Sequence, residues 1–143
     1  MARVSRSVAE FLSEARVARL ATADQSGRPH VVPICYAFDG HNFFTALDRK
    51  PKKVAMNRLK RVRNILQNEN ISLVVDHYVE DWSKLRYVIV SGKARLLLTG
   101  REHRKAISLL NKKYPQYRKM HLTDLKAPII KIQPHKVVSW GRF

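Results

Sequence analysis

Short apolar runs separated by turn-forming residues fill the first third of the sequence, and this alternation constrains the fold most strongly. Residues 24–27, Asp-Gln-Ser-Gly, are dense in turn formers, and Asp39-Gly40 is typical of a two-residue hairpin. Pro33 has no backbone N–H, so its run is expected to be an edge strand or to carry a bulge. The pattern predicts a three-stranded meander with strands over residues 17–22, 31–38 and 42–47.

The rest of the chain alternates amphipathic helices with longer strands. Helical spacing of apolar residues predicts helices over residues 5–15, from an N-cap at Asn57 to residue 67, and over residues 101–114. Further strands are expected over residues 71–78, 85–98 and 129–140. Gly92 predicts a bulge or bend in one of them, and Pro134 an interruption of another. We therefore expect one mainly β domain over residues 1–143, an antiparallel sheet or barrel with flanking helices.

The length and the composition exclude several classes of protein. A chain of 143 residues suits a single domain, and its one cysteine excludes an intrachain disulfide framework and a multi-cysteine zinc site. No apolar run reaches the ~18–20 residues that a membrane span needs. Arg3 and Arg6 are not followed by the apolar stretch of a signal peptide, so the expected location is the cytoplasm.

The charge is the unusual property of the composition. Lysine and arginine number 28 and aspartate and glutamate 11, which gives a formal net charge of +17. Such a charge attracts nucleic acid, a membrane surface or a phosphorylated ligand, or it simply covers a solvated helix face. No aromatic residue lies between Phe44 and Tyr78, which disfavours nucleic acid. Eight of the basic residues form what we call the basic segment: Arg49, Lys50, Lys52, Lys53, Arg58, Lys60, Arg61 and Arg63.

Few side chains in the sequence point to catalysis by the protein itself. Cys35 lies within an expected strand and is interpreted as a small buried hydrophobic residue. No serine occupies a nucleophile elbow, and the six histidines show no metal-binding spacing. The five glycines form neither a phosphate-binding loop nor a dinucleotide fingerprint. If the protein is an enzyme, a cofactor is expected to supply the chemistry.

Several motifs in sequence order resemble one known family. Residues 19–33, then Asp39-Gly40, then Arg63-Asn64-Ile65 and residues 71–76 are similar to the pyridoxamine 5′-phosphate oxidase-like split-barrel proteins. Glu69 and Asn70 replace the Asn-Pro pair that is usual in the family. The motifs that resemble the subgroup of probable coenzyme F420-dependent enzymes are Lys50-Pro51-Lys52, residues 59–65 and residues 76–82.

The resemblance implies a six-stranded split β-barrel, like FMN-binding proteins, that forms a homodimer with two cofactors in clefts between the subunits. Members bind FMN or F420, and a few bind heme. Carried onto this sequence, Val32, Pro33, Ile34 and Cys35 line the cofactor ring, and Thr45 approaches the phosphate. The basic residues that match the family are Arg49, Lys50, Lys52, Lys53, Lys60 and Arg61. The residues expected to approach the cleft from the partner chain are His77, Trp82 and Trp140.

The implied activity is oxidoreduction, by hydride transfer between F420 and a small unsaturated molecule. F420 carries a tail of glutamates, and the basic segment holds more positive charge than the single phosphate of FMN requires. The alternatives are an FMN-binding oxidase or flavin reductase, a cofactor carrier without turnover, and a nucleic-acid-binding protein. Tyr36, His77 and Tyr78 are candidates for a general acid by position only, and the sequence identifies neither the substrate nor the direction of hydride transfer.

Overall fold

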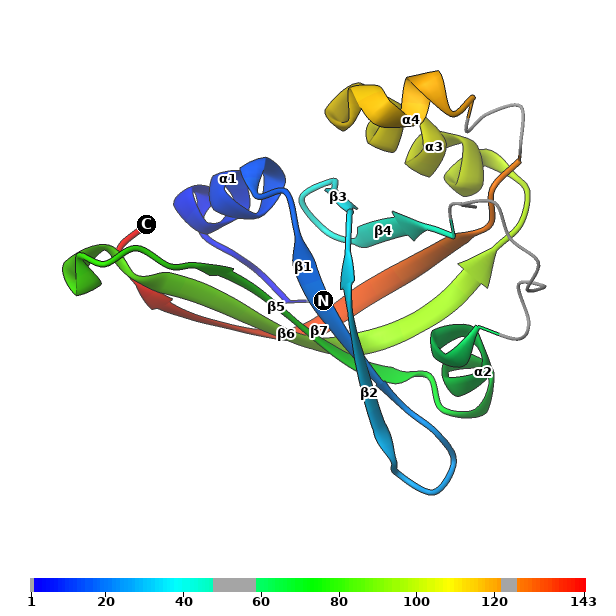
Figure 1. The fold of residues 1–143 in the computed structure, drawn as a ribbon, viewed down its shortest axis with the longest axis horizontal. Helices are drawn as coiled ribbons and strands as arrows, with labels where there is room; N and C mark the ends of the chain where they lie inside the picture. The colour runs from blue at the N-terminus through cyan, green and yellow to red at the C-terminus, as the bar shows by residue number, and fades with distance from the viewer. Residues whose placement is uncertain (1, 48–58, 122–125) are drawn as a thin grey trace.

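A curled antiparallel sheet forms the centre of the computed structural model, which describes residues 2–47, 59–121 and 126–143 (Figure 1). Among these residues the sheet has seven strands in the order β2-β1-β5-β6-β7-β4-β3. The strands are β1 (Ala18–Ala23), β2 (Pro29–Ile34), β3 (Ala37–Phe38), β4 (Phe43–Ala46), β5 (Asn70–His77), β6 (Arg86–Leu97) and β7 (Ile129–Gly141). The helices are α1 (Arg6–Glu14), α2 (Lys60–Gln67), η2 (Trp82–Lys84), α3 (Arg101–Lys113) and α4 (Pro115–Lys119). The predicted mainly β split barrel with flanking helices is confirmed.

The prediction of one continuous strand over residues 31–38 is wrong. The chain leaves the sheet at Cys35 and Tyr36, so that β2 and β3 lie at the two opposite edges. This division accounts for seven strands where the resemblance implies six. The following turn is also longer than predicted, because Phe38 pairs with Phe43 and leaves four residues between the strands.

The long strands β6 and β7 form the backbone of the fold. Their pairing shifts register between Ser91 and Gly92, opposite Pro134, which confirms the bulge that Gly92 predicts. Because β7 continues through Pro134, the expected interruption is limited to this irregularity. Past the bulge, the β5–β6–β7 ends extend as a narrow blade that carries the η2 turn at its tip (Figure 1).

Two apolar clusters hold the helices on the sheet. One lies between α1 and the inner face of the sheet, where Leu12 and Leu20 are fully buried with Val88. The other lies beneath α3 and α4 and includes Phe44 and Leu110. No helix in the described ranges is long and apolar enough to cross a membrane.

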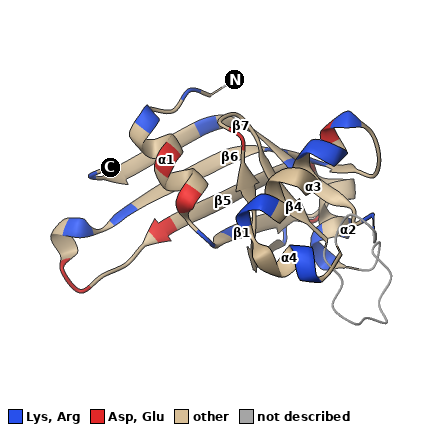
Figure 2. Cartoon of the chain, turned by 90° about the horizontal axis from the view of Figure 1, so that it is seen from above, with Lys and Arg blue, Asp and Glu red and all other residues tan. Residues whose placement is uncertain are grey.

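Helix α2 buries Val62 and Ile65 and exposes Arg63, so the predicted division into an apolar and a basic face is confirmed. Its N-cap is Leu59, without a side-chain cap, and the predicted N-cap Asn57 lies outside the described residues. Lysine and arginine are spread over many elements of the fold (Figure 2). The charge of +17 is therefore not confined to the basic segment.

Candidate cofactor-binding site

The stretch predicted to line the cofactor ring lies at an open edge of the sheet. Strand β2 pairs with β1 alone, so the peptide groups on its other side have no strand partner among the described residues. Ile34 is buried and Val32 is half-buried, whereas Pro33 and Cys35 are exposed. An open strand edge offers backbone carbonyl oxygens and N–H groups to a planar polar molecule, although Pro29 and Pro33 contribute no N–H to this one.

The junction between β2 and β3 is fixed by side chains from both sides. The Thr45 hydroxyl, on β4, donates to the Cys35 carbonyl at 2.7 Å. The Tyr114 hydroxyl, at the end of α3, accepts from the Tyr36 backbone N–H at 3.1 Å and donates to the Arg16 carbonyl at 2.8 Å. These bonds replace the strand ladder that the junction lacks. They hold the end of β2 in a fixed conformation.

Thr45 has a different environment from the one expected of a phosphate ligand. The side chain is buried, and its hydroxyl is engaged with the junction. In this structure Thr45 positions the backbone of Cys35, and its predicted approach to a phosphate stays a prediction.

The interpretation of Cys35 as a buried hydrophobic residue is wrong, because its side chain is exposed. Ile34 and Tyr36 on either side of Cys35 are buried, so the alternation of side chains along an extended chain places Cys35 on the opposite, exposed face. Tyr36 is completely buried, its hydroxyl donates to the Leu12 carbonyl, and burial raises its pKa. Tyr36 is thereby excluded as a general acid for a bound molecule. His77 and Tyr78 are both exposed.

Lys113 is a neighbour of this junction that the sequence analysis missed. Its Nζ donates to the Ala15 carbonyl at 2.6 Å and lies 4.1 Å from the centre of the Tyr36 ring. Burial, with a smaller contribution from the Arg16 charge, lowers the pKa of Lys113 to about 8. No local pattern reveals this role, because Lys113 is almost a hundred residues from Ala15 in sequence.

Titration of Lys113 is expected to make the protein more stable as the pH rises from 8 to 10. Its pKa is about 8 in the fold and 10.5 in the unfolded chain, so the unfolded chain binds more protons across this interval. Because the group is partly exposed, we expect a gain of about 1–2 kcal/mol. Urea unfolding at several pH values should show this gain in the native protein and its loss in Lys113→Met. Lys112→Met, at an exposed neighbouring position, is the control, and an identical pH dependence in all three proteins would contradict the assignment.

Helix α2 brings two predicted basic residues close to the β1–β2 hairpin. The Lys60 Nζ lies 3.9 Å from the Asp24 carboxylate, and Arg61 is half-buried. Asp24 organises the hairpin turn by accepting from the backbone N–H groups of Ser26 and Arg28, each at 2.9 Å. The bond from the Arg28 backbone is the largest cause that lowers the pKa of Asp24, so this carboxyl stays ionised. The predicted basic residues Arg49, Lys50, Lys52 and Lys53 lie outside the described residues.

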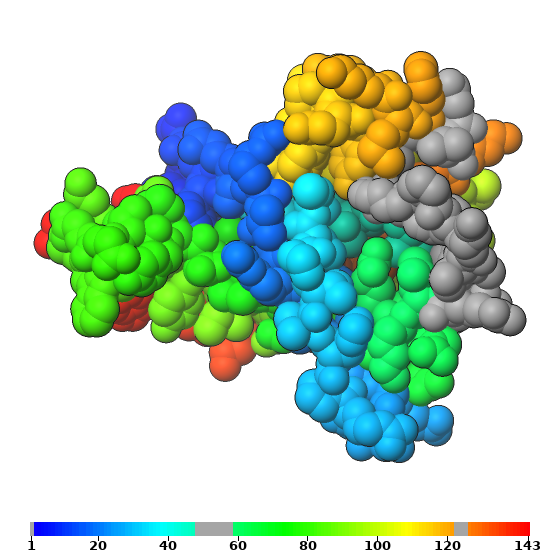
Figure 3. Space-filling view, in the orientation of Figure 1, coloured from blue at the N-terminus to red at the C-terminus, as the bar shows by residue number. Residues whose placement is uncertain are grey.

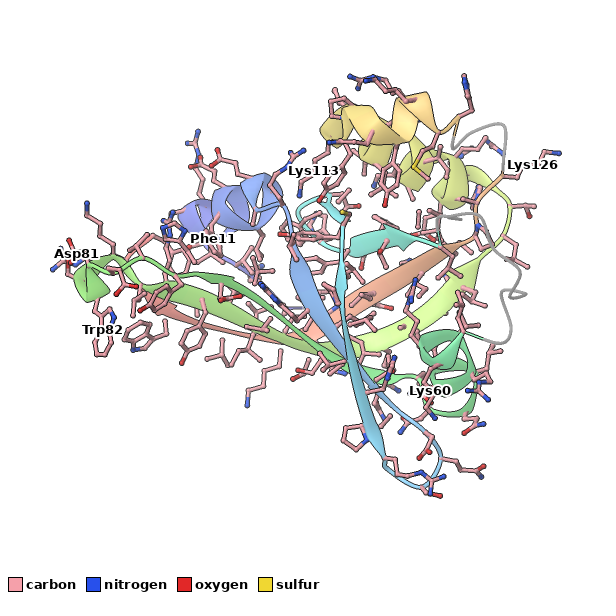
Figure 4. All side chains as sticks on the ribbon, in the orientation of Figure 1. Phe11, Lys60, Asp81, Trp82, Lys113 and Lys126 are labelled. Atoms are coloured by element: carbon pink, nitrogen blue, oxygen red, sulfur yellow. The ribbon has the colours of Figure 1, made fainter. Side chains whose placement is uncertain are left out.

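The remaining predicted residues lie at the other end of the molecule. Trp82, at the tip of the β5–β6 hairpin, and Lys60 occupy opposite ends of the view with side chains (Figure 4). The tip protrudes well beyond the body of the protein (Figure 3). His77 and Trp140 lie near the same end of the blade, because His77 pairs with Arg86 and Trp140 with Tyr87. One chain therefore does not bring the two groups of predicted residues together.

The outer face of the blade carries an apolar patch on β6 and β7 that is exposed in the single chain, next to Asp76 of β5. Tyr87 and Trp140 stack with ring centres 5.5 Å apart. Ile89 and Val138 are the next pair on the same face and are 38% and 45% exposed, and Trp140 is 51% exposed. An apolar patch of this kind marks a binding surface more often than a solvated one. We call Tyr87, Ile89, Val138 and Trp140 the outer apolar face.

Comparison with known proteins gives a consistent family. A sequence model of the pyridoxamine 5′-phosphate oxidase family matches residues 4–141. The chain is 28% identical over 124 residues to the 5a,11a-dehydrotetracycline/5a,11a-dehydrooxytetracycline reductase of Streptomyces rimosus, a match covering 86% of this chain and 72% of the relative.

Solved structures share the fold over nearly the whole chain. A conserved hypothetical protein of Mycobacterium tuberculosis matches with a TM-score of 0.77 and 18% identity, covering 99% of this chain and 86% of that one. HutZ, the heme storage protein of Vibrio cholerae, matches with a TM-score of 0.72 and 16% identity, covering 98% of this chain and 95% of that one. An FAD-binding protein of Mesorhizobium loti matches with a TM-score of 0.69 and 23% identity, covering 95% of this chain and 94% of that one. At these identities the likeness shows the fold alone.

Proposed function

Because this chain belongs to the pyridoxamine 5′-phosphate oxidase family, we propose that it is a cofactor-dependent oxidoreductase that uses F420 to transfer hydride to a small unsaturated molecule. The observation that carries the proposal is the open edge of β2, whose end is held in place by Thr45 and Tyr114. The proposed direction, reduction of the substrate, follows the activity named for the relative in Streptomyces rimosus.

The donor groups at this edge suit a flavin or deazaflavin ring. Both rings carry carbonyl and N–H groups along one side, which match the unpaired peptide groups of a strand edge. Val32 and Ile34 supply backbone atoms and an apolar contact, and Pro33 contributes no N–H. When bound, the cofactor supplies the two-electron chemistry, while the protein binds it, orients it and limits access of water.

The basic segment is the proposed site for the anionic part of the cofactor. Each partly exposed ion pair contributes only ~0.2–1 kcal/mol, so a flexible tail with several carboxylates needs several cations. The segment holds eight, including Lys60 and Arg61 on α2. FMN, with one phosphate, is the alternative cofactor, and it leaves most of these charges without a role.

The proposed enzyme is a homodimer. The ring-binding stretch belongs to β2, which crosses the middle of the molecule, whereas Trp82 lies at the hairpin tip (Figures 1 and 4). Trp140 pairs with Tyr87 on the blade near that tip. A second copy that covers the outer apolar face could supply its own hairpin tip to the open β2 edge. His77, Trp82 and Trp140 would then complete the cleft from the partner subunit.

Two titrations test the choice of cofactor directly. The purified protein is mixed with FMN or with F420, and the fluorescence of the ring is followed to saturation. We expect tighter binding of F420, and tighter binding of FMN would move the protein to the flavin-dependent class. Binding of neither would contradict the proposal, and heme would be the next ligand to test. A protein that binds F420 but transfers hydride to none of a panel of unsaturated acceptors would support a carrier.

Charge reversal in the basic segment is expected to weaken F420 binding at least ~10-fold, because two attractive pairs become repulsive. The variant is Lys52→Glu with Lys53→Glu. The matched control is Lys112→Glu with Lys119→Glu, two exposed lysines on α3 and α4 that change the net charge equally. Affinity is measured by F420 fluorescence at two salt concentrations. An equal loss in both double variants would assign the effect to net charge rather than to this segment.

A further inference from the structure

A cavity of the fold is lined by none of the described residues that were assigned above to the cofactor. It lies between the end of β6, the first half of α3 and Lys126, and its volume is about 580 Å³. Lys126 lies on the side of the molecule where β6 passes into α3 (Figure 4). Small-molecule sites commonly have volumes of ~300–1,000 Å³, so the space suffices for a small organic ligand.

The inner wall of the cavity is apolar and neutral. Leu98 and Ile107 contribute aliphatic side chains, and Leu98 is 53% exposed although it is large and apolar. His103 is buried, and its Nε2 lies 2.8 Å from the Ala127 carbonyl. Since a carbonyl only accepts, Nε2 carries the proton and donates it to this bond. His103 therefore has a fixed ring that forms part of the wall.

The rim of the cavity is cationic. Arg104 and Lys126 line it, both are exposed, and no acidic side chain lines it among the described residues. Neither cation forms an ion pair or a side-chain hydrogen bond with another described residue. With respect to the part of the chain that the structure describes, both charges are thus available to a ligand.

The first turn of α3 adds to the positive potential at this rim. Its N-cap is Gly100, which has no side chain to cap the free N–H groups of the thirteen-residue helix. Glu102, the acidic residue of this turn, is held by Lys131 at 2.5 Å and Arg95 at 3.4 Å. Its charge is therefore compensated by residues that do not line the cavity.

We propose that this cavity binds a small amphipathic anion, a molecule with one acidic group and an aromatic or branched aliphatic body. The acidic group lies at Arg104 and Lys126, and the apolar body lies against Leu98 and Ile107. An apolar pocket with a few convergent charged groups is the usual arrangement for such ligands. None of its lining residues is assigned to the proposed cofactor cleft, so its failure would leave the proposed function untouched.

The experiment uses 8-anilinonaphthalene-1-sulfonate, an aromatic probe with a single sulfonate, titrated into the full-length protein. Saturable fluorescence enhancement is expected. Arg104→Gln with Lys126→Gln should weaken it about 5–10-fold, since two partly exposed ion pairs are lost. The matched control is Arg101→Gln with Lys112→Gln, which removes two charges from α3 at positions that do not line the cavity. The control pair should bind like the native protein.

A second variant separates this cavity from other apolar surfaces. Ser108 is exposed and lines the cavity, so Ser108→Trp should fill it and block the probe, with folding checked by circular dichroism. The uncharged probe N-phenyl-1-naphthylamine should also be blocked by Ser108→Trp but retained by the Arg104 and Lys126 variant. Absence of saturable binding, or equal affinity in both charge-changed pairs, would overturn the proposal. Binding that survives Ser108→Trp would place the probe elsewhere and would also overturn it.

Discussion

Replacing Ile89 by glutamate together with Val138 by lysine is expected to yield a monomer whose cofactor affinity is at least ~100-fold weaker. The two residues pair directly across β6 and β7 on the outer apolar face. Opposite charges at such a pair support the strand pairing within one chain, so the monomer should stay folded. The same charges oppose burial against a second chain, because desolvating them costs more than the contact returns.

The size of this effect follows from the aliphatic side chains that the proposed dimer would bury. Burying an aliphatic side chain stabilises an assembly by ~1.5–3 kcal/mol, and a symmetric dimer buries each residue twice. Loss of both residues therefore removes several kcal/mol from subunit association. In the proposed dimer the cofactor is affected as well, because Trp82 and Trp140 would complete the cleft from the partner subunit.

Sedimentation velocity and cofactor fluorescence provide the two measurements. The control is Lys93→Glu with Gln133→Lys, a directly paired and exposed position on the same two strands but on the other side of the bulge. It should remain dimeric with unchanged affinity. A dimer of the Ile89 and Val138 variant would show that the outer apolar face is not the interface. A monomer that retains the cofactor would contradict a cleft shared between subunits.

The sequence predicted well those parts of the fold that depend on local signals. The amphipathic spacing of Val8 and Leu12 places α1, and both residues are buried. The bulge at Gly92 was likewise predictable, because glycine within a strand commonly marks a close approach of two backbones. Turn chemistry and periodicity act over a few residues, and a single sequence displays them directly.

The parts that were missed depend on contacts between distant segments. The break between β2 and β3 depends on Tyr114, which bonds to Tyr36 from 78 residues away. The error about Cys35 has a local cause instead, because the side chains on either side of it, Ile34 and Tyr36, are buried, and alternation then leaves Cys35 exposed. The role of Lys113 was hidden for the same reason as the break. Its position at the end of an exposed basic helix predicts solvent contact rather than a contact with Tyr36.

The candidate site was only partly predictable, because the residues predicted for it lie in two separate regions of the same chain: one near α2 and β2, the other at the tip of the β5–β6 hairpin. Family resemblance named residues from both ends of the fold, and no spacing rule shows that Trp82 lies far from Lys60. The separation is explained by the length of β6 and β7, which carry the hairpin tip away from α2. A single chain with this topology presents the open edge of β2 at one place and an exposed aromatic surface at another.

The second large effect is expected at the bulge. Gly92→Ala should destabilise the fold by about 3 kcal/mol, a large share of the ~5–15 kcal/mol typical of a domain. A Cβ at this position would lie 2.3 Å from the Gln133 carbonyl oxygen and 3.0 Å from the Pro134 Cα. Both are backbone atoms of β7, so neither can move aside as a flexible side chain would. The two longest strands would have to separate where their register changes.

Ser91→Ala is the matched control for this variant, since Ser91 is the half-buried neighbour of Gly92 in the same strand. We expect it to change the free energy of unfolding in urea by less than ~0.5 kcal/mol. The blade, which carries the outer apolar face, begins at this bulge. Gly92→Ala should therefore also weaken the proposed dimer, at urea concentrations lower than those that unfold the protein. Native stability in Gly92→Ala would mean that the approach of Gln133 to Gly92 relaxes without cost. In that case the geometry of the blade must be set by the α1 contacts instead.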